Sequence, residues 1–197
     1  RRQRQMCIRD SYQGIREANI FMQNVDKCPE INFEEKLRWK TEARFMRTYY
    51  YVMLMRMYGP VVLVGDELID IASSDLGKER STWEECMDYI CSEFDEVADI
   101  LPEEQETNWY GKPTKGAALA LKARMLLYSA RELYNSDDSF YKNIISTEGK
   151  HLFPQSYSKD KWKLAAEANK AVIDMGIYDL YKSYLSLIHI SEPTRQA

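Results

Sequence analysis

The chain has 197 residues, of which 45% are apolar and 29% are charged, and its net charge is −4. This composition excludes a disordered or collagen-like chain, and the acidic charge argues against a general nucleic-acid binder. The four Cys include no C-x-x-C pair, which excludes a disulfide scaffold and a zinc ribbon. The two His leave little room for a His-based metal site. No apolar run reaches the ~18 residues that a membrane-spanning helix needs.

The two ends of the chain differ from the sequence between them. Residues 1–11 (RRQRQMCIRDS) and 185–197 (LSLIHISEPTRQA) match in-frame translations of a transposon-based sequencing adapter. The two inferred DNA strings, AGATGTGTATAAGAGACAG and CTGTCTCTTATACACATCT, are reverse complements, as inverted adapter ends must be. We therefore expect two adapter-derived tails around residues 12–184, a helical-domain fragment with a net charge of −7. Different codons for Met6 to Asp10 in the source DNA would contradict this.

Helical spacing of apolar side chains dominates the segment between the tails. Eight Gly and six Pro are fewer than the roughly 12% usual in globular domains, which also favours helices. A first helix is expected over residues 12–25, with a stripe of Ile15, Ala18, Met22 and Val25. A second helix is expected over residues 33–58, ending at Gly59-Pro60, with a buried face of Leu37, Met46, Tyr49, Tyr50, Met53, Leu54 and Met57.

A short apolar run and a polar loop are expected to precede the third helix. Residues 61–64 form either a strand fragment or an extended plug over the core, and residues 66–78 form the loop. Ser81 and Glu84 have the spacing of a capping box, which opens a helix. That helix carries a narrow apolar seam toward other helices, formed by Trp83, Met87, Ile90, Phe94, Val97 and Leu101.

Two further helices are expected near the C-terminus. Thr114 caps a helix that reaches residue 134, whose Ala residues allow close approach of a neighbour. After a long loop at residues 135–159, the last helix covers residues 160–175, with Gly176 as its C-cap. Small residues on both helices are typical of a helical-hairpin repeat. The predicted fold class is all-α, with a tetratricopeptide-like helical repeat scaffold.

No residue pattern supports catalysis, a cofactor or a metal. Three acidic pairs could in principle serve a glycosidase, but adjacent residues on a helix point to different sides, so solvated helix faces explain them better; the pairs are Glu84/Glu85, Asp95/Glu96 and Glu103/Glu104. Cys28, Cys86, Cys91 and His151 lack the spacing of zinc ligands. The three Cys are expected to be buried as small hydrophobic residues.

Two aromatic residues stand out because they lie in a loop. Trp109 and Tyr110 belong to the polar connection at residues 103–113, where a large flat side chain has less reason to be present for packing. Flat aromatic faces stack on sugar rings and other ligands, so both are candidate ligand-binding residues. The alternative is a loop that these two rings anchor onto the helices.

Five segments, taken in order, resemble the SusD/RagB family of outer-membrane nutrient-binding lipoproteins from Bacteroidota. They are YQGIREAN at residues 12–19, EARFMRTYYY at 42–51 with Tyr58-Gly59, RST at 80–82 with Leu101-Pro102, GKPTKGAA at 111–118 with Ala123-Arg124, and Trp162 with Ala165-Ala166 and YDL at 178–180. The departures are small, since Val62 stands where Pro is usual and Lys112 where Arg is common.

The resemblance implies a surface protein that binds nutrients and performs no chemistry. Family members sit on the outer membrane through an N-terminal lipidated Cys, which would lie upstream of these residues. They bind glycans or other nutrients and deliver them to a SusC-type TonB-dependent transporter. Motif residues Arg44, Arg47, Arg80 and Arg124 are expected to form scaffold ion pairs. The alternative function is a helical-repeat scaffold that binds a protein partner and no small ligand.

Overall fold

The computed structural model describes residues 2–68 and 78–180, with side chains from Ile8 onward. Within these residues the chain forms α-helices and short 3-10 helices, and its only β-bridge joins Ile145 to His151. The elements are α1 (Arg2–Asn24), η1 (Val25–Lys27), α2 (Phe33–Tyr58), α3 (Trp83–Ile100), η2 (Thr107–Trp109), α4 (Lys115–Ala130) and α5 (Lys159–Asp174). The all-α prediction is confirmed. Most of the loop expected at residues 66–78 lies outside the described residues.

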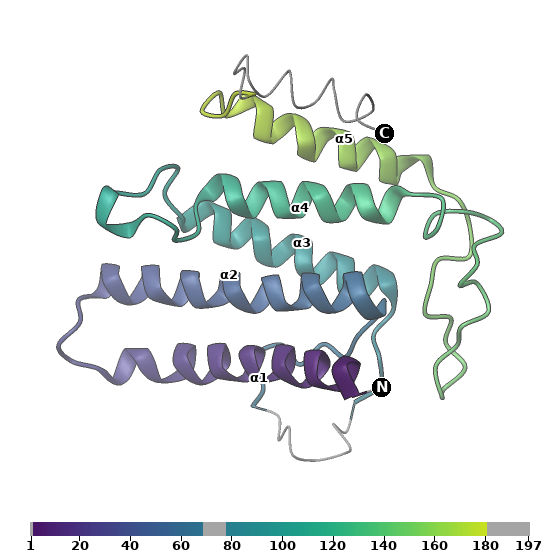
Figure 1. Cartoon of the computed structure of the whole chain (residues 1–197), viewed down its shortest axis with the longest axis horizontal. Coiled ribbons are helices and arrows are strands. Elements are labelled where there is room, and N and C mark those ends of the chain that lie inside the picture. The colour runs from purple at the N-terminus through teal and green to yellow at the C-terminus, as the bar shows by residue number, and fades with distance from the viewer. Residues whose placement is uncertain (1, 69–77, 181–197) are drawn as a thin grey trace, which may run out of the picture.

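The helices stack side by side, and each packs against the helix before it in the chain (Figure 1). The α1–α2 and α3–α4 connections lie together at one end of the stack, and the α2–α3 and α4–α5 connections lie at the other (Figure 1). This succession of helix hairpins agrees with the tetratricopeptide-like prediction. Among the described helices, none combines the length and the hydrophobicity that a membrane-spanning helix requires.

Two helix boundaries differ from the sequence prediction. The first helix begins at Arg2, so the expected start at residue 12 is wrong; residues 2–11 contain neither Pro nor Gly to stop a helix. The fourth helix ends at Ala130 instead of residue 134, because Arg131 has an extended backbone. The turn that follows brings the ring of Tyr134 onto Trp83, with a centroid distance of 4.1 Å.

The N-terminus of α3 is capped one residue later than predicted. Thr82, not Ser81, is the N-cap: its hydroxyl accepts a hydrogen bond from the backbone N–H of Glu85 at 3.2 Å. The Glu85 carboxylate accepts one from the backbone N–H of Thr82 at 2.7 Å. The predicted capping box therefore exists, shifted by one residue. Ser81 instead donates its backbone N–H to the carbonyl of Val61.

The buried face of α2 was predicted wrongly. Of the seven residues expected there, only Leu54 is buried, and Leu37, Met46 and Met57 are exposed. The side that is buried contains Thr41, Phe45, Arg47, Thr48, Tyr51, Val52, Leu54 and Met55. Apolar residues of α2 occur on every side of the helix, so their spacing does not identify the face that is buried. The buried face is determined by packing against α1 on one side and α3 on another.

The apolar seam of α3 forms the centre of the core. All six of its predicted residues are buried, so that prediction is confirmed. Residues 61–64 are an extended plug, not a strand. The Tyr12 hydroxyl donates to the Val62 carbonyl at 2.9 Å and accepts from the Val62 N–H at 3.0 Å. The Tyr51 hydroxyl accepts from the Val64 N–H at 3.1 Å. These hydroxyls satisfy backbone groups that a partner strand would otherwise have to satisfy.

A buried ion cluster joins α2 to α3. The Glu93 carboxylate accepts from Arg44 at 2.6 Å and from Arg47 at 2.7 Å. Burial raises the pKa of Glu93, but hydrogen bonds from the two guanidinium groups outweigh burial, and the pKa lies below its usual value. Arg44 also binds Glu96, and Arg47 binds Asn19 of α1. The scaffold role predicted for Arg44 and Arg47 is therefore confirmed.

The other two motif arginines behave differently. Arg80 donates to the backbone carbonyls of Pro60 and Tyr58, at 2.7 and 3.2 Å. It therefore holds the end of α2 by backbone hydrogen bonds, and it forms no ion pair with a residue that the structure describes. Arg124 is exposed on α4 and forms no ion pair with any described residue, so the expected scaffold ion pair stays a prediction for it.

Candidate functional site

The candidate site is the α3–α4 loop, residues 102–114, whose ends are held close together. The Lys115 N–H donates to the Pro102 carbonyl at 2.9 Å, and the Gln105 side chain donates to the Pro113 carbonyl at 2.7 Å. Gly111 has a φ of 96°, a left-handed conformation that favours glycine. The loop is thus a closed unit with a fixed backbone, so a side chain at its tip is presented in a defined place.

Trp109 lies against a frame of charged side chains that belongs partly to α2. The Lys112 ammonium is 3.9 Å from the centre of the indole ring, and the Arg38 guanidinium carbon is 5.0 Å from it. Glu42 links the two cations, at 3.0 Å from Lys112 and 3.3 Å from Arg38. Arg38 also donates to Gln105 at 2.9 Å. This frame fixes Trp109, whose side chain remains 38% exposed.

Tyr110 has the opposite environment. It is 92% exposed, and it takes part in no aromatic ring contact among the described residues. Sequence reasoning grouped Trp109 and Tyr110 together, whereas the structure separates their environments. The alternative interpretation, in which the ring anchors the loop onto the helices, fits Trp109, whereas Tyr110 projects into solvent beside it. The loop therefore presents one partly held ring and one free ring next to two cations and a carboxylate.

Sequence reasoning missed Arg38, Glu42 and Gln105 as parts of this site. Arg38 and Glu42 are four residues apart, so they share one face of α2, but they are 60 or more residues away from the loop in sequence. No local pattern could join them to Trp109. Lys112 was noted as a departure from a family motif and not as a neighbour of Trp109, although its ammonium lies over the indole ring.

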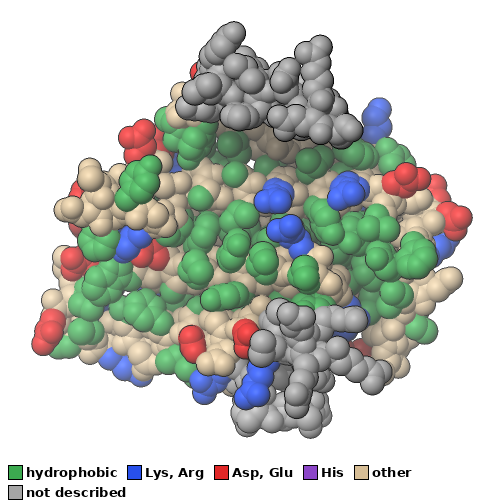
Figure 2. Space-filling view, viewed as in Figure 1, with side chains coloured by type: hydrophobic (Ala, Val, Ile, Leu, Met, Phe, Trp, Pro, Cys, Tyr) green, Lys and Arg blue, Asp and Glu red, His purple; other side chains and the backbone are tan. Residues whose placement is uncertain are grey.

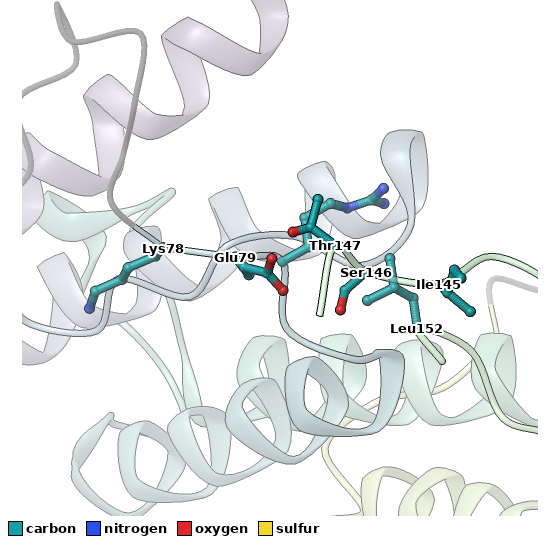
Figure 3. Close-up of a pocket in the computed structure, with 7 residues that line it drawn as sticks. Lys78, Glu79, Ile145, Ser146, Thr147 and Leu152 are labelled. Atoms are coloured by element: carbon teal, nitrogen blue, oxygen red, sulfur yellow. The ribbon is translucent and has the colours of Figure 1, made fainter. Parts of the chain in front are cut away.

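A second hollow lies at the other end of the stack and has different chemistry. It is a cavity of about 640 Å3 between residues 78–80 and the hairpin at residues 144–152. Figure 3 shows Lys78 and Glu79 from the first segment across from Ile145, Ser146 and Thr147 of the second. No aromatic ring lines it. It offers hydroxyl and charged groups but no flat apolar face on which a sugar ring could stack.

Comparison with known proteins identifies the family of this chain. Residues 4–127 match the SusD-like family, which is described as starch-binding associating with outer membrane. The chain belongs to the SusD-like family. A curated SusD-like protein of Bacteroides ovatus is 28% identical over 129 residues, which are 64% of this chain and 22% of that protein.

Solved structures agree with this assignment. The structure of BT4246 superposes with a TM-score of 0.79 at 30% identity, over 88% of this chain and 31% of that one. A structure solved with a xylogluco-oligosaccharide has a TM-score of 0.61 at 22% identity, over 92% and 31% of the two chains. This SusD-like chain spans less than a third of the length of these relatives.

The described residues of this SusD-like chain show no constellation for catalysis or metal binding. No group of three or more His, Cys, Asp or Glu side chains within them is placed to hold a metal ion. The acidic pairs on α3 are engaged in surface ion pairs, with partners Lys161, Lys150, Lys122 and Arg44. Burial raises the pKa of the Cys86 thiol to about 11 and that of Cys91 to about 12, which suppresses the nucleophilic thiolate. Cys86 is buried as expected, whereas Cys28 and Cys91 are only half-buried.

Proposed function

We propose that this SusD-like chain binds glycans at the bacterial cell surface, through a site that includes the Trp109–Tyr110 loop. The observation that carries the proposal is the 92% exposure of Tyr110 on a loop whose ends are fixed by hydrogen bonds. A rigid loop that holds a large ring in water gains no packing from that ring, so a ligand-binding role explains its presence.

The loop can bind a saccharide without performing chemistry on it. The phenol face of Tyr110 stacks on the apolar face of a sugar ring, and Trp109 adds a second aromatic surface beside it. Arg38 and Lys112 donate hydrogen bonds to sugar hydroxyls, and Glu42 accepts them. None of these residues supplies a pair of carboxylates facing each other across a cleft, which glycoside hydrolysis requires. The proposed role is therefore binding, not catalysis.

The remaining part of the proposal concerns location and partner. The family is described as associating with the outer membrane, and we place this protein on its outer surface, attached through a lipid anchor upstream of these residues. The partner is a SusC-type TonB-dependent transporter that receives the glycan. Figure 2 shows a band of hydrophobic side chains along α2 and α4, and exposed apolar residues of these helices include Met46, Met57 and Leu127. Such a surface supports a protein partner.

The glycan part is tested by calorimetric titration of the chain with uncharged oligosaccharides such as maltoheptaose and a xyloglucan oligosaccharide. Tyr110→Ala should weaken the binding by about tenfold. Phe140→Ala is the matched control, because Phe140 is another highly exposed aromatic residue (85%), on the α4–α5 loop. Equal losses in the two variants would contradict the assignment of Tyr110.

The transporter part is tested separately, in the source genome and in cells. A gene for a TonB-dependent transporter should lie immediately upstream, and the two proteins should purify together from outer membranes. A helical-repeat scaffold without a small ligand, the alternative function, predicts co-purification with a protein but no response to any oligosaccharide.

A further inference from the structure

A third cavity lies at the corner where α4 ends and α5 begins. It has a volume of about 410 Å3, which is within the range of small-ligand sites. Its lining includes Glu132, Asp137, Asp138, Tyr157 and Trp162. We call it the corner cavity. The corner is at the opposite end of the stack from the Trp109–Tyr110 loop (Figure 1).

Two half-exposed aromatic rings form the apolar part of this lining. Tyr157 is 52% exposed and Trp162 is 42% exposed, and neither stacks on another aromatic ring within the described residues. Other aromatic residues of the same loop are packed together, since Tyr134, Tyr141 and Phe153 stack on one another. The rings at the corner therefore have apolar faces that the fold itself does not use.

The walls of the corner cavity are held in place by a buried amide. Asn135 is 1% exposed, and its side chain donates to the Ser158 carbonyl at 2.8 Å and accepts from the Ser158 N–H at 2.7 Å. The Asp137 carboxylate accepts from the Tyr157 N–H at 2.9 Å. Both segments that carry the rings are thus tied to the end of α4. Such preorganisation reduces the entropy that a ligand loses on binding.

The polar part of the lining consists of hydrogen-bond acceptors. Glu132 and Asp138 form no ion pair with a described residue, and Ser136 adds a hydroxyl. Carboxylate oxygens accept hydrogen bonds from hydroxyl groups and repel anions. These carboxylates are not grouped for a metal ion within the described part of the chain. Acceptors spread around two aromatic faces match an uncharged ring that carries several hydroxyls.

We propose that the corner cavity is a second saccharide-binding site, selective for uncharged sugars over acidic ones. The inference rests on the proposed glycan-binding function and adds a site distinct from the Trp109–Tyr110 loop. Stacking on Trp162 and Tyr157 provides the contact with the sugar ring, and Asp138 and Glu132 select against uronic acids and sulfated sugars.

The test uses the 197-residue chain labelled with 15N, because each of its four Trp gives a separate indole N–H signal. The chain is titrated with maltoheptaose, a xyloglucan oligosaccharide and trigalacturonate. The Trp162 signal should shift and saturate with an uncharged oligosaccharide and remain unchanged with trigalacturonate. Tyr157→Ala, in an exposed loop, should weaken this response by about tenfold and keep the other three signals in place, which shows that the fold is intact.

A matched variant separates the two sites. Tyr110→Ala should leave the Trp162 response unchanged. A Trp162 signal that stays fixed while Trp109 responds would refute the corner site and leave the proposed function standing. If no indole responds to any sugar, both proposals fail. If Trp162 responds equally to trigalacturonate and to the uncharged sugars, the role of Asp138 and Glu132 is refuted. If wild type rejects trigalacturonate, Asp138→Asn should bind it.

Discussion

Two loops at opposite ends of the helical stack are rich in aromatic residues, but they place these residues in different surroundings. In the α4–α5 loop Tyr134 and Phe153 stack on the buried Trp83, with ring-centre distances of 4.1 and 5.8 Å. In the α3–α4 loop the ring of Trp109 lies beneath two cations, and Tyr110 contacts no aromatic ring of the described residues. The same residue types therefore hold Tyr134 and Phe153 of one loop to the core and leave Tyr110 of the other loop exposed. The two loops differ in whether a buried aromatic ring, here Trp83, lies next to their own rings, and the sequence of a loop does not show this.

The largest expected effect is at the centre of the stacked rings. Trp83 is fully buried, and its indole N–H donates to Ser129 at 2.8 Å. Trp83→Ala should lower the free energy of unfolding by about 3–5 kcal/mol, because it removes a large buried side chain and leaves a cavity. Urea denaturation followed by circular dichroism measures the change. A loss below about 1 kcal/mol would show that the α4–α5 loop is not held by this stack.

The next effect concerns the hydrogen bonds that close the α4–α5 loop. Asn135→Ala leaves the backbone N–H and carbonyl of Ser158 without their present partner. We expect a loss of about 1–3 kcal/mol, measured in the same denaturation experiment. Asn169 of α5 provides the control: its side chain donates to the carbonyl of Ala165, four residues earlier on the same helix, and Asn169→Ala should change stability much less.

A smaller effect is expected for Trp109, which is held by cations instead of rings. Trp109→Ala removes the contacts with Lys112 and Arg38 and should lower the free energy of unfolding by about 1 kcal/mol. If the loss equals that of Trp83→Ala, the contrast between the two loops is wrong. High salt should weaken the Trp109 contribution because it screens partly exposed charges.

Acid should weaken the attachment of the α4–α5 loop to the N-terminus of α3. The Lys150 ammonium and the backbone N–H of Thr82 lower the pKa of Glu85 to about 2, from a usual value of 4.5. Because the folded-state pKa is depressed, Glu85 stabilises the fold above about pH 4.5, and this contribution is lost as the pH falls toward 2. Its carboxylate is half exposed, which keeps the effect small. The stability difference between wild type and Glu85→Gln should therefore shrink over that pH range; a constant difference would contradict the shift.

The smallest effect on stability is expected for Tyr110. Tyr110→Ala should change the free energy of unfolding by less than about 0.5 kcal/mol, because surface substitutions away from buried contacts are nearly neutral. The same variant should weaken oligosaccharide binding. A marked loss of stability would show that Tyr110 packs on the protein and is not available to a ligand.

Sequence periodicity predicted the fold well where one helix face alone is apolar. All six seam residues of α3 are buried, because charged residues occupy its opposite face. On α2 the same reasoning selected the wrong face, since Met and Tyr occur on every side and the neighbouring helices decide. The end of α4 was also missed, because stacking of Tyr134 on Trp83 stops a helix that its composition would continue.

The candidate site could be predicted only in part. The position of Trp109 and Tyr110 in a polar loop was visible in the sequence, but their different surroundings depend on Arg38 and Glu42 of another helix. Asn135 and Trp162 lie 27 residues apart, so the corner cavity depends on the path of a long loop that periodicity does not describe. The two tails at residues 1–11 and 185–197 remain a prediction about the source DNA.

The central claim is that the rings of the α3–α4 loop bind a saccharide while the rings stacked on Trp83 hold the fold, and indole signals test it most directly. In a 15N-labelled sample titrated with an uncharged oligosaccharide, the Trp109 signal should shift and saturate, and the signal of the buried Trp83 should remain in place. A Trp83 shift as large as that of Trp109, or no response from Trp109 to any oligosaccharide, would contradict the account.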